Sequence, residues 1–166
     1  MIAQLSAIRC MQIGALLMLM IGASQTQAQN RFTVSADGQE VLDSTTNLSW
    51  RRCAEGMQWD GKACGGKPTN FKLAGAREDA AAAGKAGSKA WRLPTKDELR
   101  GIVVKSKKKP MTDTAAFPNT PSAMFWATRP GFTDNLNAWL VHFGNGRVYG
   151  NTNAGKFYLR LVRANS

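Results

Sequence analysis

Several ingredients are scarce in this chain of 166 residues, and each scarcity excludes a class of protein. One histidine and three cysteines leave little material for a zinc cluster or a histidine-based catalytic triad. No Gly-X-Y tract is present, so the chain is not collagen-like. Its apolar run, Met11–Ala23, is shorter than the roughly 20 residues that a membrane-spanning helix needs. The mean hydropathy of -0.30 excludes a polytopic membrane protein.

Acidic residues are also few. There are 11 Asp and Glu against 22 Lys and Arg, which gives a net charge of +11 and an isoelectric point near 10.1. Hydrophobic residues make up 43% of the chain and charged residues 20%, which is ordinary for a folded domain and excludes a wholly disordered one. The composition predicts a small, basic domain that works by binding.

The first 28 residues have the three-part order of a secretory signal peptide. Residues 1–10 carry a single basic side chain, residues 11–23 are apolar, and residues 24–28 are small and polar. We therefore predict cleavage at the end of this segment and a single mature domain over residues 29–166, with its core at about 40–163. An uncleaved anchor is the alternative interpretation.

Export changes how the cysteines are interpreted. Only Cys53 and Cys64 remain after cleavage, and an even number in an oxidising compartment favours one disulfide. The rival interpretation is two free thiols, one of them a nucleophile. No histidine lies near either cysteine in the sequence, and export disfavours free thiols.

The mature chain has the pattern of an α+β domain. The Ala-rich residues Phe71–Lys85 predict one helix, and Thr95 with Glu98 three residues later predicts a capping box that starts a second. Residues 54–70 are expected to form a disulfide-bounded loop. Short alternating runs predict strands at 31–35, 41–42, 48–50, 125–128, 138–143, 147–149 and 157–163. We expect one antiparallel sheet whose N- and C-terminal strands meet, with two helices packed on it and long loops.

Aromatic and arginine residues have two possible roles. The block Trp91-Arg92-Leu93-Pro94 stands between the two predicted helices, and a buried Trp–Arg stack explains it without a ligand. Trp50, Trp126 and Trp139 lie in strand patterns and are expected in the core rather than on a sugar-binding platform. Arg160 and Arg163 close the last strand, where either could pair with an acidic group such as Asp43.

The order of short sequence blocks resembles the Lcl C-terminal domain family of bacterial exported proteins. The matching blocks are Val41-Leu42-Asp43, Leu48-Ser49-Trp50, Trp91-Arg92-Leu93-Pro94-Thr95 with Glu98-Leu99, Ala116-Phe117-Pro118-Asn119-Thr120, Phe125-Trp126-Ala127-Thr128, Ala138-Trp139-Leu140-Val141 and Tyr158-Leu159-Arg160-Leu161-Val162-Arg163. The resemblance implies a C-type-lectin-like α+β fold, similar to the sulfatase-modifying fold. It also implies a surface adhesin that binds sulfated glycosaminoglycans, although the collagen-like stalk of the namesake proteins is missing here.

A run of lysines follows the second predicted helix. Lys105, Lys107, Lys108 and Lys109 lie within five positions and form a candidate polyanion-binding site. In an exported protein the reachable polyanions are acidic or sulfated glycans, envelope phosphates and extracellular DNA. Nucleic acid is the less favoured of these ligands, because the sequence contains no aromatic-rich basic strand. The plain alternative is a solvated loop with its cations at a helix C-terminus.

These observations lead to three hypotheses of different classes. The leading one is an exported, non-catalytic, lectin-like domain of the periplasm or cell surface that binds an anionic glycan or envelope component. The second is a structural or assembly protein of the envelope or a pilus, whose partner is another protein. The third is a formylglycine-generating-like enzyme, but its chemistry needs a late cysteine pair and residues 65–166 contain no cysteine. We expect no metal, no cofactor and no catalytic residue.

Overall fold

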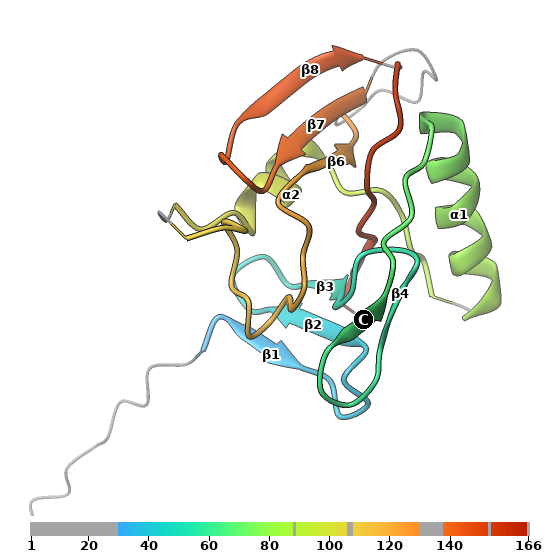
Figure 1. Cartoon of the computed structure of the whole chain (residues 1–166). Coiled ribbons are helices and arrows are strands. Elements are labelled where there is room, and N and C mark those ends of the chain that lie inside the picture. Colours follow the sequence, from blue (N-terminus) through green and yellow to red (C-terminus); the bar gives the residue numbers. More distant parts are fainter. Residues whose placement is uncertain (1–29, 88, 106–107, 130–137, 153, 166) are drawn as a thin grey trace, which may run out of the picture.

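In the computed structural model, the described residues are 30–87, 89–105, 108–129, 138–152 and 154–165. They form two helices and nine strands in the α+β class expected from the sequence (Figure 1). The predicted signal peptide lies outside this part of the chain. The strands are β1 (Phe32–Val34), β2 (Glu40–Asp43), β3 (Leu48–Arg51), β4 (Met57–Trp59), β5 (Cys64–Gly66), β6 (Met124–Ala127), β7 (Ala138–His142), β8 (Val148–Thr152) and β9 (Val162–Ala164), and the helices are α1 (Leu73–Ala86) and α2 (Lys96–Gly101).

The first sheet joins the two ends of the folded domain. Its strand order is β1-β2-β3-β9, and every pair is antiparallel. The prediction that N- and C-terminal strands meet is therefore confirmed. Trp50 of β3 faces Val162 of β9 across the ladder, and both are fully buried.

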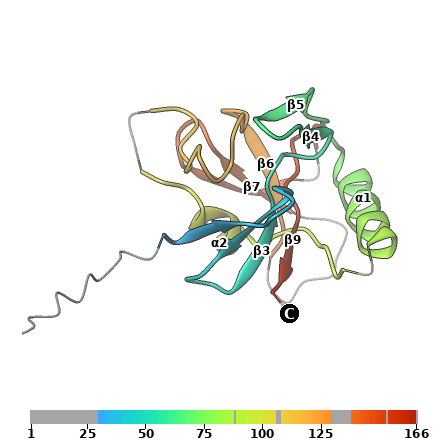
Figure 2. The same ribbon diagram turned by 90° about the horizontal axis from the view of Figure 1, so that it is seen from below.

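The second sheet, β6-β7-β8, is buried on both faces of β6 and β7. One face carries Phe125 and Val141, which pack with residues of β2, β3 and α2 between the two sheets. The opposite face carries Trp126 and Leu140, which pack with α1 and the 157–161 segment. Because successive strand residues point to opposite faces, a strand that is buried on both faces carries mostly apolar side chains. Figures 1 and 2 show α1 beside this sheet.

The prediction of one continuous sheet is wrong, because the described strands divide into two sheets and a hairpin. Residues 157–161, expected to be a strand, make only isolated bridges, including Phe71 with Phe157 and Phe125 with Tyr158. Leu159 and Arg160 are both fully buried although they alternate in direction. The segment passes through the interior and touches both sheets, so it cannot pair along its length with either.

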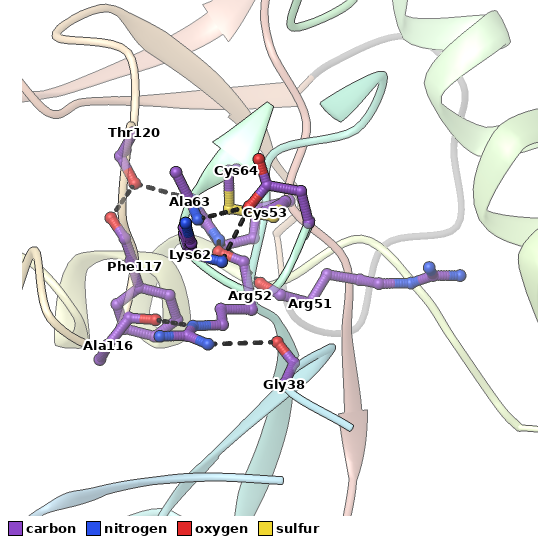
Figure 3. Close-up of a disulfide and its surroundings, with 12 residues drawn as sticks. Gly38, Arg51, Arg52, Cys53, Lys62, Ala63, Cys64, Ala116, Phe117 and Thr120 are labelled. Carbon is purple, nitrogen blue, oxygen red and sulfur yellow. Dashed lines mark hydrogen bonds between the residues drawn. A yellow bond between two sulfur atoms is a disulfide. The ribbon is translucent and has the colours of Figure 1, made fainter. Parts of the chain in front are cut away.

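The predicted 54–70 loop also differs, since it contains the β4–β5 hairpin. Its turn is held by Asp60, whose carboxylate accepts the backbone N–H groups of Lys62 and Ala63 at 2.8 Å each. The disulfide between Cys53 and Cys64 is confirmed and nearly buried (Figure 3). It ties the hairpin to the chain that leaves β3.

The capping box of α2 is confirmed. Glu98 N–H donates to Thr95 Oγ1 at 3.2 Å, and Thr95 N–H donates to Glu98 Oε2 at 2.7 Å. Leu99 of this short helix and Ile102, which directly follows it, are fully buried against both sheets. The Ala-rich α1 buries Leu73, Ala76 and Ala80, as its spacing predicts. Its small side chains let the helix lie close to the rest of the domain.

Candidate functional site

The predicted lysine run lies in a loop that is fixed at both ends. Val104 N–H donates to Met111 O at 3.0 Å, and Thr112 Oγ1 donates to Ile102 O at 2.9 Å, so the loop closes on itself. Lys105, Lys108 and Lys109 are exposed on it, whereas Lys107 lies outside the described residues. We call residues 104–111 the lysine loop.

The lysine loop docks on the turn between β7 and β8. Met111 N–H donates to Phe143 O at 2.6 Å. A Cβ atom at Gly146 would lie 3.3 Å from Val103 Cγ1 and 3.4 Å from Met111 Sδ, so the turn and the loop are in contact. The sequence Asn145-Gly146 is typical of a hairpin turn, and Gly146 has φ of 69°, a conformation that favours glycine.

The turn that docks on the lysine loop carries further polar side chains, which the sequence reasoning missed. Arg147 and Tyr149 follow Gly146 and are exposed, and Asn145 Nδ2 donates to the Tyr149 hydroxyl at 3.1 Å. A cation, an amide and an exposed aromatic ring are side chains that bind charged sugars and other polar ligands. The Asn-Gly signal predicts the turn, but nothing in the sequence places it against the lysine loop.

A pocket of about 480 Å³ opens on the other side of the loop, between β1 and residues 113–116. It is lined by Phe32, Val104 and Ala116 together with Arg31 and Asp113. Val104 is 43% exposed and is one of two large hydrophobic side chains at the surface of the described residues. The lysine loop therefore separates a partly apolar pocket from the β7–β8 turn.

The expected partner of Asp43 is different from the one observed. Arg31 donates to both carboxylate oxygens of Asp43 at 2.9 and 2.7 Å, whereas Arg160 and Arg163 pair elsewhere. Burial acts to raise the pKa of Asp43, but hydrogen bonds from Arg31 and the Thr45 N–H outweigh it, so the pKa lies below its ordinary value. Arg31 is thereby held at the rim of the pocket.

The expected Trp–Arg stack also has other partners. Trp91 is nearly buried. The guanidinium groups of Arg51 and Arg163 lie over its ring, with Cζ at 5.0 and 5.5 Å from the ring centroid. Arg92 is exposed and instead donates to both carboxylate oxygens of Glu98 at 2.8 Å each. Leu93 and Pro94 are buried, so the block still fixes the start of α2. The neighbouring residues of a sequence block need not stack on one another, because their side chains diverge in extended backbone.

Arg160 is a fully buried structural arginine. It donates to the carbonyl oxygens of Arg51 and Arg52 and, at 2.8 Å, to Thr120 Oγ1. Arg163 pairs with Glu40 at 2.7 Å. Figure 3 shows how closely Arg51, Arg52 and Thr120 surround the disulfide.

The remaining candidates have structural roles. Trp50 and Trp126 are fully buried and Trp139 is half-buried, which agrees with the expected core positions. His142 Nδ1 accepts the N–H of Gly144 at 2.8 Å in the β7–β8 turn. Within the described ranges, no group of three or more His, Cys, Asp or Glu side chains could hold a metal ion. The same ranges contain no helix long and apolar enough to span a membrane.

Comparison with known proteins identifies one family. The family model of the Lcl C-terminal domain matches residues 39–163. This range runs from β2 into β9 and includes the second sheet, the first sheet except β1, the disulfide and the lysine loop. No curated protein and no solved structure matches the chain.

Proposed function

The chain belongs to the Lcl C-terminal domain family, and we propose that it is an exported, non-catalytic binding domain for an anionic glycan or cell-envelope component. The likeness to C-type lectins stays a prediction that supports this proposal. The observation that carries the proposal is the lysine loop. Its backbone is anchored at Ile102 and Phe143, and it exposes Lys105, Lys108 and Lys109 to solvent.

The charge balance favours a polyanionic ligand. A net charge of +11 attracts anions over the whole molecule, and a run of lysines close together in the chain adds local contacts. Each cation that replaces a counterion on a polyanion makes binding dependent on salt. The non-catalytic part of the proposal is supported by the cysteines, since both that follow the predicted signal peptide are joined in the disulfide.

The test compares two variants of equal charge. In the first, Lys105, Lys107, Lys108 and Lys109 are replaced by glutamine. In the second, the exposed residues Lys62, Lys67, Lys72 and Lys85 are replaced by glutamine. Binding of residues 29–166 to heparin is measured by calorimetry at several salt concentrations.

We expect the first variant to bind more weakly and to have a shallower salt dependence, by about one or less in log–log slope for each lost contact. The matched control should lose much less. Equal losses in both variants would mean that only net charge matters. Unchanged binding in the first variant would remove the lysine loop from the site, and a stable complex with another envelope protein without heparin binding would favour the assembly hypothesis.

A further inference from the structure

A second recess lies between the end of α1, the start of β2 and Trp91. Its volume is about 300 Å³. Ala83 and Ala86 form its wall on α1, and their small side chains leave room where larger ones would fill the space. Arg51, Lys89 and Trp91 face them.

The cations around Trp91 differ in whether an acid neutralises them. Lys89 and Arg163 both bind the carboxylate of Glu40, and Arg92 is paired with Glu98. Arg51 has no carboxylate within ion-pair distance among the described residues, and its Nε has no hydrogen-bond partner there. Arg51 is therefore the cation of the recess that makes no direct ion pair with an acid in the described residues.

The acids that line the recess are already engaged. Glu40 accepts from Lys89 and Arg163, as described above. Asp37 accepts the Ser35 hydroxyl at 2.6 Å and the Gln39 N–H at 3.0 Å. These hydrogen bonds, led by the one from Ser35, hold the pKa of Asp37 below its ordinary value. Neither carboxylate makes an ion pair with Arg51.

Two partly buried acids, Glu55 and Asp79, interact electrostatically with Arg51. Glu55 lies two residues after Cys53, and Asp79 lies on α1. One carboxylate oxygen of each is buried with no hydrogen-bond partner in the described residues. The charged groups that act on Glu55 are Arg51 of β3, Asp79 of α1 and Arg160 of the 157–161 segment. Burial raises the pKa of Glu55 to about 7 and also raises that of Asp79. Arg51 thus lines the recess and also interacts with the charges of Glu55 and Asp79.

We propose that the recess beside Trp91 is an oxyanion site, in which Arg51 binds a sulfate or carboxylate group and the protonation of Glu55 sets how strongly it does so. A planar guanidinium lying on an aromatic ring is oriented for paired hydrogen bonds to such a group. When Glu55 is neutral, Arg51 faces less internal negative charge, and the anion binds more tightly. That the group belongs to an acidic glycan rests on the proposed function, whereas the site itself does not.

The experiment titrates residues 29–166 with sodium sulfate at constant ionic strength. Sulfate keeps its charge across the pH range used, so changes in affinity report on the protein. The readouts are the NMR signals of the Arg51 Nε–H and the Trp91 indole N–H. We expect saturable shifts in the unmodified chain and at least about a tenfold loss of affinity in Arg51→Gln, the loss of a charge-assisted hydrogen-bond pair. Arg51→Lys should fall between the two.

Arg100→Gln is the matched control, because it removes one exposed arginine from α2 and should leave the affinity unchanged. Lowering the pH from about 8 to about 5.5 should strengthen sulfate binding several-fold in the unmodified chain, where a coupling of one pKa unit corresponds to a factor of ten. Glu55→Gln should abolish most of this difference.

Sulfate shifts that persist in both Arg51 variants would overturn the site, and an equal pH dependence in Glu55→Gln would overturn the role of Glu55. Sulfate binding at Arg51 together with absent heparin binding would leave the site standing and contradict only the proposed function. Heparin binding without any sulfate-induced shift at Arg51 would support the proposed function and overturn the site.

Discussion

The guanidinium of Arg52 lies over the ring of Trp59, with Cζ 3.6 Å from the ring centroid. Arg52 follows β3 and Trp59 ends β4, so this contact fastens the disulfide-closed hairpin to the first sheet. The same guanidinium donates to the carbonyl oxygens of Gly38 and Ala116 (Figure 3) and also to that of Ala115. The hairpin is thus held by a covalent bond on one side and by a stacked arginine on the other.

Gly38→Ala should be strongly destabilising. Gly38 has φ of 72°, and a Cβ atom there would lie 2.3 Å from Trp59 Nε1. The substitution therefore combines backbone strain with displacement of the ring, for a loss of about 2–4 kcal/mol in the free energy of unfolding. Urea denaturation measures it. Gly61→Ala is the control, because Gly61 also has positive φ but a Cβ atom there would meet nothing within 4 Å. A loss no greater than that of the control would show that the ring contact is unimportant.

Replacing both Cys53 and Cys64 by serine should lower the free energy of unfolding by about 2–3 kcal/mol, since a short loop is released in the unfolded state. The first sheet and α1 should remain, because Arg52 still holds the hairpin. Circular dichroism and urea denaturation test both points. Free thiols in exported, correctly folded protein would contradict the disulfide.

Thr120→Val should cost about 1–3 kcal/mol. It removes the acceptor for Arg160 Nη2 and leaves a buried charged donor without that partner. Arg160→Met removes the charge and should cost more, because the carbonyl oxygens of Arg51 and Arg52 then lose a common donor. Thermal unfolding of the two variants ranks them. The opposite order would mean that Thr120 matters for packing alone.

The stability of the protein should fall as the pH rises through the range set by Glu55. Its pKa is raised to about 7 from an ordinary value of 4.5, chiefly by burial. Between these values the folded protein holds a proton that the unfolded chain has released, so the free energy of unfolding decreases with rising pH and levels off above about 7.

Glu55→Gln should remove most of this slope, leaving the part due to Asp79, whose pKa burial also raises, and should raise stability more at about pH 8 than at about pH 5. Urea midpoints at several pH values provide the measurement. Glu40, Asp43 and Glu98 do not obscure it, because their pKa values are lowered and they change stability only at more acidic pH. A parallel pH profile in the variant would show that Glu55 is not the group responsible.

Local signals in the sequence predicted local structure well. The capping box at Thr95, the Asn145-Gly146 turn and the pairing of two cysteines each depend on a few residues that are close in the chain. The partners of Trp91 were not predictable in this way. Arg51 and Arg163 approach Trp91 from strands that are distant in the chain. The sequence contains many arginines and does not indicate which of them lies on this ring.

The division into two sheets was missed for a similar reason. The alternation of apolar and polar residues at 157–163 is typical of a strand, whether the polar side chains point to solvent or to the interior. Only the three-dimensional structure shows that Arg160 is buried. Glu55 lies within the segment 54–70, which the sequence predicts to be a loop, so the sequence does not indicate that this acid is buried. Its burial depends on α1 and the 157–161 segment, which lie far from it in the chain.

The placement of β9 in the first sheet has a consequence for proteolysis. The lysine loop offers trypsin several cleavage sites, and a cut there separates the chain into an N-terminal piece with β1–β5, α1 and α2 and a C-terminal piece with β6–β9. Because β9 pairs with β3 and Val162 is buried against Trp50, the two pieces remain interleaved. A nicked protein should migrate as one species on a sizing column and as two on a denaturing gel, and the separated pieces should be able to reassemble only with each other.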